Sequence, residues 1–450
     1  MTVSAIGSKQ RVYTFPRGGI SFDDSSVPSR DSYETAYLPS LSVISLTQHT
    51  GGRAYPIVSV GDAVKEGMLI GRGQGPGSAN VHATVPGRVI RLASWKNPGG
   101  QIQEGLVIRM EGSFEKLGKR EEIFSWEGML PYDIQRTISD FGVVEMEGGG
   151  RPVSDIISAL RSASETVTLV VRCVFDDPWL ASDYVLCRSR AKAIAEGAVI
   201  TARTCRVNRI IYAISQGERA LADELLAAGS KWGIPAAVVL VGSKYPQRGR
   251  RELELVLRNY GKRENLDLGS LFILGPATLA AVFDAVKMRK PVLERFITVG
   301  GSAVKKPQVM KVRIGTRVGE IFAECGGFTG APKRIASGSP LLGRPIMDLD
   351  EPVVKTSYAI FALLEGYRRD RYENCISCGE CRNVCPVGLD PEELYKKTII
   401  DANGDLSRIS SPGRAVGLAA ECHGCGCCEV VCPSRLPLST AITASVLRRN

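Results

Sequence analysis

The 450-residue sequence lacks any continuous apolar segment long enough to cross a membrane. Its best apolar run, LFILGPATLAAVF, is interrupted by Gly275 and Pro276 and falls short of the roughly 18 apolar residues of a spanning helix. The first residues, MTVSAIGSKQRVYTF, also lack the apolar core of a secretory signal. We therefore expect a chain that folds in the cytoplasm, keeps its thiols reduced and reaches a membrane only through other subunits.

Clustered positive charge is also missing. The net charge is +10, from 57 basic and 47 acidic side chains, but the basic residues are scattered along the chain. No Lys/Arg-rich run with interleaved aromatic residues occurs, and aromatic residues make up only 6% of the sequence. The balance argues against nucleic acid as a partner and favours acidic proteins, with anionic lipid as an alternative.

Cysteine, in contrast, is concentrated near the C-terminus. Eight of the 13 cysteines form two copies of C-x-x-C-x-x-C-x-x-x-C-P, which are Cys375, Cys378, Cys381 and Cys385 before Pro386, and Cys422, Cys425, Cys428 and Cys432 before Pro433. This spacing is typical of bacterial ferredoxins that hold [4Fe–4S] clusters. In such two-cluster proteins the fourth cysteine of each run ligates the other cluster. We therefore assign Cys375, Cys378, Cys381 and Cys432 to one cluster, and Cys422, Cys425, Cys428 and Cys385 to the other. We expect the chain to move electrons one at a time.

Zinc sites or disulfides are the alternative interpretation of these cysteines. Structural zinc sites usually show C-x-x-C pairs separated by a long spacer, which fits two runs of four poorly. Cys427 directly precedes Cys428 and is expected not to be a ligand, and His423 is expected to donate a hydrogen bond near a cluster. The other cysteines share no spacing and are expected to be buried, reduced thiols: Cys173, Cys187, Cys205 and Cys325.

Upstream of the cysteine runs, the sequence changes character along the chain. Residues 40–95 contain short strands separated by Gly turns, which is typical of a small barrel or sandwich. Residues 130–285 alternate buried-type strands with helices, which predicts a largely parallel sheet. Residues 291–345 return to short strands and predict a β-grasp-like module, and residues 352–370 are predicted to be helical.

These patterns predict a multidomain α/β and α+β protein. Its parts are an N-terminal segment with a barrel-sandwich hybrid, a Rossmann-like α/β domain, a β-grasp-like module of the SLBB type and a helical two-cluster ferredoxin domain. The predicted ranges are, in that order, 1–125, 126–288, 289–350 and 351–450.

The order of these modules resembles the C subunit of the Rnf electron-transport complex. The N-terminal FPRGGISF, the later VRIGTRVGEIFAECGGF and the paired cysteine runs carry the resemblance. Related proteins are cobalamin reductase and the NADH-binding flavoprotein subunit of respiratory complex I. The resemblance implies a peripheral subunit at the cytoplasmic face of the cell membrane. It would join other Rnf subunits that couple electron flow between ferredoxin and NAD to ion translocation.

The family's Rossmann-like domain is expected to meet FMN and NADH through a G-L-G-G-A-x-F-P-T loop, and this chain departs from that pattern. It has FGVVEMEGGGRPVSD, in which Glu145, Met146 and Glu147 fall near the expected glycines, and two carboxylates would repel phosphates. A shifted loop and a second motif, VFDDPWLASD, leave four candidate nucleotide-site residues: Gly148, Gly149, Gly150 and Asp177. In the second motif Phe175 replaces a usual acidic residue. FMN and NADH binding is therefore doubtful.

The leading hypothesis is an electron-transfer subunit of an Rnf-type complex, with two [4Fe–4S] clusters and no acid–base catalytic residues. Its soluble carrier would be ferredoxin, flavodoxin or NADH, and the positive net charge favours the first two, which are acidic. One alternative is a soluble FMN-dependent NADH reductase of the cobalamin reductase type. Another is a structural adaptor, which would have no need of eight placed thiolates.

Overall fold

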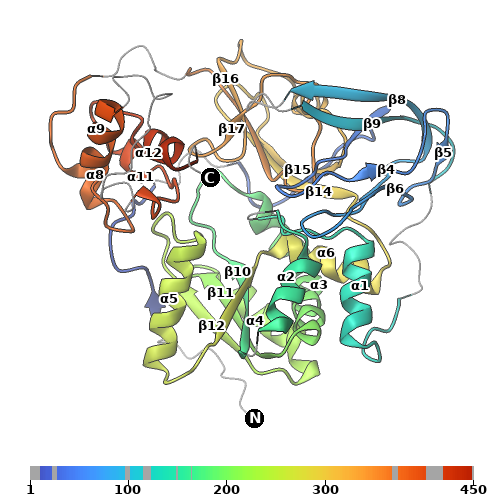
Figure 1. Ribbon diagram of the computed structural model, residues 1–450, viewed down its shortest axis with the longest axis horizontal. Helices are drawn as coiled ribbons and strands as arrows, with labels where there is room; N and C mark the ends of the chain where they lie inside the picture. The colour runs from blue at the N-terminus through green and yellow to red at the C-terminus, as the bar shows by residue number, and fades with distance from the viewer. Residues whose placement is uncertain are drawn as a thin grey trace.

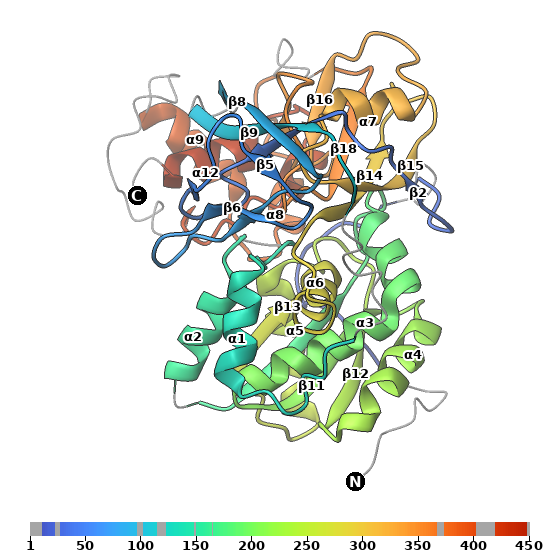
Figure 2. The ribbon, with the colours of Figure 1, turned by 90° about the vertical axis from the view of Figure 1, so that its right-hand side faces the viewer.

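The structure is a computed structural model that describes residues 11–22, 28–96, 102–114, 123–147, 150–163, 165–366, 373–401 and 419–447. A parallel-sheet domain forms one half of the molecule, and the barrel, the β-grasp module and the cysteine-rich domain form the other (Figures 1 and 2). This architecture confirms the predicted multidomain α/β and α+β class. Among the described residues, no helix combines the length and the apolar character needed to cross a bilayer.

The N-terminal module is built from two small antiparallel sheets that enclose an apolar core. One sheet has the order β3-β9-β8-β5, with strands Leu41–Ser45, Ile102–Met110, Gly87–Lys96 and Ala63–Val64. The other has the order β4-β6-β7, with strands Tyr55–Pro56, Leu69–Arg72 and Val81–His82. Ile44, Ile70 and Leu106 are among the side chains that fill the space between them. The predicted barrel-sandwich hybrid is therefore present.

The central domain contains a sheet of order β1-β12-β11-β10-β13 in which every pairing is parallel. In sequence order its main strands are β10 (Val167–Cys173), β11 (Val207–Ser215), β12 (Ala236–Val241) and β13 (Ser270–Leu274). Its helices are α1 (Pro131–Asp140), α2 (Val153–Ser162), α3 (Ser182–Thr204), α4 (Arg219–Gly229), α5 (Arg250–Arg263) and α6 (Pro276–Lys287). The strand order reverses at β10, which has β11 on one side and β13 on the other. In doubly wound folds, ligands bind outside the carboxyl ends of strands at such a point.

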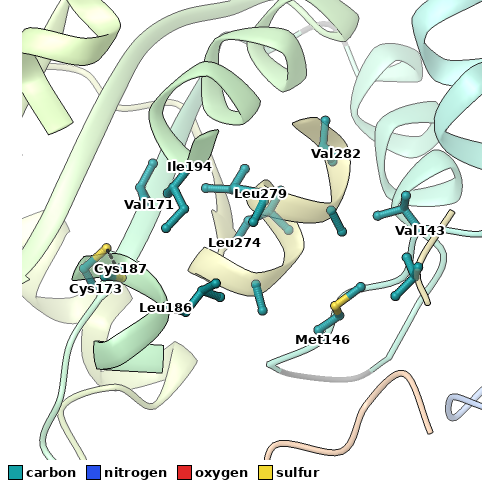
Figure 3. Close-up of a cluster of buried hydrophobic side chains, with 14 of the residues drawn as sticks. Val143, Met146, Val171, Cys173, Leu186, Cys187, Ile194, Leu274, Leu279 and Val282 are labelled. Carbon is teal, nitrogen blue, oxygen red and sulfur yellow. Dashed lines mark hydrogen bonds between the residues drawn. The ribbon is translucent and has the colours of Figure 1, made fainter. Parts of the chain in front are cut away.

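Burial on both faces explains why these strands are continuous apolar runs. Leu169 and Val171 of β10 face the core that also contains α3 and α6, whereas Val170 faces the core beneath α5. Figure 3 shows the first of these cores, with Val171 of β10 and Leu274 of β13 near Leu279 and Val282 of α6. The sheet is therefore covered by helices on both sides.

The third module is a mixed sheet of order β17-β16-β18-β14-β15-β2. Its strands β14–β18 are Glu294–Gly300, Gln308–Arg313, Arg334–Ser337, Arg344–Pro345 and Ala359–Leu363, and α7 (Val318–Glu324) follows β15. Strand β14 pairs with β15 in antiparallel and with β18 in parallel orientation, as a β-grasp requires. The helix predicted over residues 352–370 is wrong, because β18 lies there. A short buried apolar run does not distinguish a strand from a helix by periodicity alone.

The described part of the N-terminal segment connects three modules. Strand β1 (Val12–Tyr13) pairs with β12, and β2 (Glu34–Thr35) pairs with β15. Between them, the N–H of Gly19 donates to the carbonyl of Val384 in the first cysteine run at 2.8 Å. The segment therefore adds strands to two sheets that lie outside the barrel. The predicted domain boundaries at residues 125, 288 and 350 stay a prediction.

Lys355, between β17 and β18, joins the β-grasp module to the barrel and to the parallel-sheet domain. Its side chain is 1% exposed, and its ammonium donates to the carbonyls of Asn80 and Gly142 at 2.6 and 2.7 Å. These acceptors belong to the barrel and to the turn after α1. Burial lowers the pKa of Lys355 to about 7. The module junction is thus held by one enclosed amine and two carbonyl oxygens.

The cysteine-rich domain contains four helices among its described residues and lies next to the start of α5 (Figure 1). They are α8 (Glu380–Asn383), α9 (Pro391–Asp401), α11 (Cys427–Val430) and α12 (Leu438–Leu447). The two shortest carry cysteines of the two runs. The predicted helical ferredoxin-type domain is therefore present.

A tight contact between α3 and α6 gives a test of the central domain. A Cβ at Gly197 of α3 would overlap the backbone carbonyl of Leu279 in α6. We expect Gly197→Ala to destabilise the protein by about 1–3 kcal/mol, because overpacking a backbone contact outweighs the better helix propensity of Ala. Anaerobic urea unfolding followed by circular dichroism measures the loss.

Gly217 supplies the matched control, because it is exposed and a Cβ there meets nothing within 4 Å. Gly217→Ala should change stability by less than about 0.5 kcal/mol. Equal stability of the two variants would contradict the packing described for α3 and α6.

Candidate functional sites

The two cysteine runs share one local backbone conformation. Ser377 and Gly424, each two residues after the first cysteine of its run, have φ values of 54° and 70°. Gly379 and Gly426, each two residues further on, have φ values of 78° and 76° and precede the one-turn helices α8 and α11. A left-handed residue is favourable for Gly and strained for Ser. The two loops are therefore built alike.

The structure brings the last cysteine of the second run to the first loop. One cavity is lined by Cys375, Cys378, Cys381 and Cys432, with Ile376 and Leu436 among its apolar walls. These are the four cysteines that the ferredoxin pattern groups together. Apolar walls around convergent thiols are the donor set and the dry shell that an iron–sulfur cluster requires.

The remaining four cysteines gather at the second loop. Cys385 packs with Cys422 in an apolar cluster that includes Leu389 and Ile442. Burial first, and then neighbouring thiolates that include Cys385, raise the pKa of both Cys422 and Cys428. Among the described residues, no three Cys, His, Asp or Glu side chains are arranged to hold one metal ion. A four-iron cube holds its ligand sulfurs further apart than one ion does, so this spacing is no argument against a cluster.

The two loops differ in their surroundings. Cys378 is exposed and its neighbour Ile376 is 66% exposed, whereas Cys385 and Cys428 are each 7% exposed. The second loop contacts the parallel-sheet domain, where the hydroxyl of Tyr245 donates to the carbonyl of Cys425 at 2.9 Å. The first loop is therefore nearer to solvent, and the second is packed against the domain that carries α5.

His423 and Cys427 lie at this contact. A hydrogen bond with Cys425 and the carboxylate of Glu252, whose oxygen is 3.2 Å from the His423 Nε2, raise the pKa of His423 against the effect of burial. The hydrogen bond fits the expectation that His423 is a donor beside the cysteines. Cys427 is fully buried, consistent with its sequence position between two candidate ligands.

The other four cysteines are buried and free, as predicted. No spacing or motif indicates that two of them meet in the fold. The thiol of Cys187 in α3 lies 3.7 Å from the sulfur of Cys173 at the end of β10 (Figure 3). Burial and the hydrogen bond with Cys173 raise the pKa of Cys187, so this thiol stays protonated.

The structure describes two of the four candidate nucleotide residues, and one of them, Asp177, follows the carboxyl end of β10. Gly148 and Gly149 are outside the described residues. Gly150 is buried with a φ of 66°, and a Cβ there would lie 3.1 Å from the backbone nitrogen of Thr50. Asp177 is 3% exposed, and its carboxylate accepts a hydrogen bond from the N–H of Trp179 at 3.1 Å. Gly150 thus packs against the barrel, and Asp177 closes the turn after β10.

The carboxylate of Glu147 lies against the first turn of α6. Its Oε1 accepts from the N–H of Thr278 at 3.0 Å, and its Oε2 accepts from the Thr278 hydroxyl at 2.5 Å. Thr278 lies in the first turn of α6. The Arg172 guanidinium donates to the Glu147 carbonyl at 2.8 Å. Burial raises the pKa of Glu147, with Asp183 adding to the rise and Arg295 opposing it.

Asp176 and Arg248 form another hydrogen-bonded contact nearby, and Arg172 also donates to the carbonyl of Arg248. The carboxylate of Asp176 accepts from the backbone N–H of Arg248 at 3.0 Å, and its other oxygen has no hydrogen-bond partner among the described residues. Burial raises the pKa of Asp176 to about 6. Burial likewise raises the pKa of Asp177. Three carboxyl groups with raised pKa values therefore lie near these strand ends, together with the guanidinium groups of Arg172 and Arg248.

These residues do not fit FMN. Free backbone N–H groups at a helix N-terminus form a favourable site for a flavin phosphate. In this chain the Thr278 N–H and hydroxyl are taken by Glu147, and Arg172 is turned to backbone carbonyls.

The raised pKa of Asp176 predicts a pH-dependent cost. A carboxyl whose folded pKa, about 6, exceeds its ordinary value of 3.8 favours folding below pH 3.8, and this contribution is lost as pH rises through 6. Asp176→Asn keeps the neutral form at every pH. We expect it to stabilise the protein at pH 7.5 by about 1–3 kcal/mol, and the gain should shrink below pH 6. Anaerobic urea unfolding at several pH values measures this.

Asp223→Asn, at an exposed position of α4, is the matched control and should give no pH-dependent gain. A gain from Asp176→Asn that is independent of pH would contradict the burial explanation.

Comparisons with known proteins agree with the module order. Family models match in sequence order as the RnfC barrel sandwich hybrid domain (residues 14–113), the Nuo51 FMN-binding domain (138–267), the SLBB domain (296–348) and the 4Fe-4S dicluster domain (371–436). The dicluster match supports two [4Fe–4S] clusters in this chain. A solved NAD+-reducing [NiFe]-hydrogenase chain is 15% identical with a TM-score of 0.49, over 71% of this chain and 61% of that one.

Three relatives that match most of this chain are C subunits of ion-translocating complexes. The C subunit of the ion-translocating oxidoreductase complex of Rhodobacter capsulatus is 34% identical over 404 residues, which cover 88% of this chain and 77% of the relative. The C subunit of the proton-translocating ferredoxin:NAD(+) oxidoreductase complex of Clostridium ljungdahlii is 29% identical, over 84% of this chain and 83% of the relative. The Na(+)-translocating counterpart from Acetobacterium woodii is 26% identical, over 78% and 80%. The chain therefore belongs to the RnfC family, the C subunits of ion-translocating oxidoreductase complexes.

Proposed function

We propose that this chain is the electron-transfer subunit of an Rnf-type complex and that its two cysteine runs exchange their last ligands. One cluster would be held by Cys375, Cys378, Cys381 and Cys432, and the other by Cys422, Cys425, Cys428 and Cys385. The observation that carries the proposal is the cavity at which Cys432 joins the three cysteines of the first run. Bound [4Fe–4S] clusters take up and release single electrons at potentials set by their surroundings.

The chain's own residues fix those surroundings. The positive-φ residues of each loop turn the backbone around the thiols, and Leu436 and Leu438 keep water away from the first group. At the second group, Tyr245 and His423 bring hydrogen bonds to the backbone and to the thiol of Cys425. Cys427 is buried behind this loop and is not a ligand in this proposal.

The proposed partners are other subunits of the complex at the cytoplasmic face of the cell membrane and an acidic soluble carrier. A ferredoxin or flavodoxin fits the net charge of +10, because opposite charges steer such proteins together. The exposed loop around Cys378 is the surface at which such a carrier would come nearest to a thiol group.

A soluble FMN-dependent NADH reductase is the second candidate function. The match of residues 138–267 to an FMN-binding domain favours it. The hydrogen bonds from Thr278 to Glu147 argue against it, because they occupy the donors that a phosphate would need.

Paired substitutions test the proposed ligand exchange. The anaerobically reconstituted chain should hold about eight irons, and Cys375→Ala, Cys432→Ala or Cys385→Ala should each leave about four. Combining Cys375→Ala with Cys432→Ala should still leave about four, because both residues serve the same cluster. Combining Cys375→Ala with Cys385→Ala should remove both clusters. Iron and sulfide analysis with electron paramagnetic resonance measures the content.

Cys427→Ala is the matched control and should retain about eight irons, because its thiol is assigned no cluster. Loss of both clusters from the Cys375/Cys432 double variant would show that each run supplies all four ligands of its own cluster.

Reduction assays separate the two candidate functions. Reduced ferredoxin should bleach the visible absorption of the loaded protein, whereas NADH should not, with or without added FMN. The rate with ferredoxin should fall steeply with ionic strength, because association between oppositely charged proteins is screened by salt. Stopped-flow spectrophotometry under argon measures both. Rapid bleaching by NADH in the presence of FMN would establish the reductase instead.

A further inference from the structure

The N-terminus of α6 lies where a ligand anion is expected in this fold. Helix α6 has 12 residues and follows β13, next to the central strand β10 at which the strand order reverses. Its first-turn N–H groups point out from the carboxyl end of the sheet. The free N–H groups and the dipole of a helix N-terminus favour negative charge.

A carboxyl group of the protein itself already lies there. Glu147 reaches the first turn of α6 from a loop 131 positions earlier in the sequence and accepts both hydrogen bonds that Thr278 donates. Gly275, the residue before α6, has no side chain, and a Cβ added there would overlap the Glu147 carboxyl carbon. The helix start is therefore shaped around this carboxyl group.

The guanidinium groups near Glu147 already donate hydrogen bonds to backbone carbonyls of the chain. Arg172 donates to the backbone carbonyls of Glu147 and Arg248. Arg295 is 4% exposed and donates to the carbonyl of Ser357, and its charge lies near enough to act on Glu147. Two guanidinium groups beside one anion position are what a phosphate site would use. Here they surround a glutamate.

We propose that Glu147 is a built-in occupant of the anion site at the start of α6. Its carboxyl group takes the two donors of Thr278, so the Rossmann-like domain keeps its fold without a nucleotide phosphate. Removing the carboxyl group should expose a site for inorganic phosphate. The inference deepens the proposed function and rests on it, since a domain closed in this way leaves electron transfer to the cysteine-rich domain.

An ordinary helix cap is the simpler explanation, and it predicts a different result. A cap contributes only stability, so its removal lowers stability whatever anion is present. A built-in occupant also excludes other anions, so its removal creates an affinity that the parent protein lacks. Phosphate dependence therefore distinguishes the two, whereas stability alone does not.

The experiment compares the full-length, cluster-loaded protein with Glu147→Gly and Glu147→Gln. Thermal unfolding is followed by circular dichroism under argon, with inorganic phosphate titrated against chloride at constant ionic strength. Phosphate should raise the Tm of Glu147→Gly and bind it at least about tenfold more tightly than the parent. Glu147→Gln should behave like the parent, because the amide fills the same space.

Two controls complete the design. Glu145→Gly removes a neighbouring carboxylate but leaves both hydrogen bonds from Thr278 to Glu147 in place. This variant should therefore not create phosphate dependence. Glu147→Ala replaces Glu147→Gly if the glycine variant does not fold. Equal phosphate stabilisation of the parent, or none in either small variant, would overturn the inference. Stoichiometric FMN binding by the parent protein would overturn it as well.

Iron content is measured in the same samples and keeps this test separate from the proposed function. Phosphate dependence in samples that retain no iron would support the proposed role of Glu147 and contradict the two proposed clusters. Retained iron without phosphate dependence would contradict only the proposed role of Glu147.

Discussion

A charge enclosed by protein must have a partner, and this constraint organises the centre of the molecule. Desolvating an ion costs several kcal/mol unless hydrogen bonds or opposite charges replace the lost water. Arg172 and Arg295 meet the requirement by donating to backbone carbonyls within their own modules, and Lys355 does so by donating to carbonyls of the barrel and of the turn after α1. Each of these groups joins segments that are distant in sequence, and Lys355 also joins the β-grasp module to the barrel and to the parallel-sheet domain. Glu147 is the anionic member of the same system.

The same constraint explains how, in the proposal made above, the parallel-sheet domain keeps its fold without a bound phosphate. A phosphate at a helix N-terminus contributes negative charge as well as contacts, so its loss would leave N–H groups and guanidinium groups unbalanced. A carboxyl group delivered from a loop of the same chain supplies both. Gly275 leaves space for this carboxyl group, since a Cβ there would overlap the Glu147 side chain in its present position. The domain thus closes on itself at the position where doubly wound folds bind their ligands.

Sequence patterns predicted the parts of this structure that depend on local chemistry. Local sequence is enough to predict the buried strands β10–β13, the start of α6 at Pro276 and the pairing of the cysteine runs with a ferredoxin-type domain. Contacts between distant residues were beyond such reasoning. The run containing β18 is equally compatible with a helix, because only its pairing with β14 makes it a strand. The meeting of Cys173 with Cys187 and the reach of Glu147 to Thr278 likewise depend on tertiary packing.

The parallel-sheet domain retains a structural role even if no nucleotide binds there. The second cysteine loop rests on it through Tyr245, and Arg251 at the start of α5 pairs with Glu421 just before that loop at 2.5 Å. The N-terminal segment reaches the first run from the same sheet, through β1 and the hydrogen bond of Gly19 to Val384. Both runs are therefore oriented by contacts that begin on this domain. A domain that positions both loops in this way contributes to the proposed electron transfer whatever its strand ends bind.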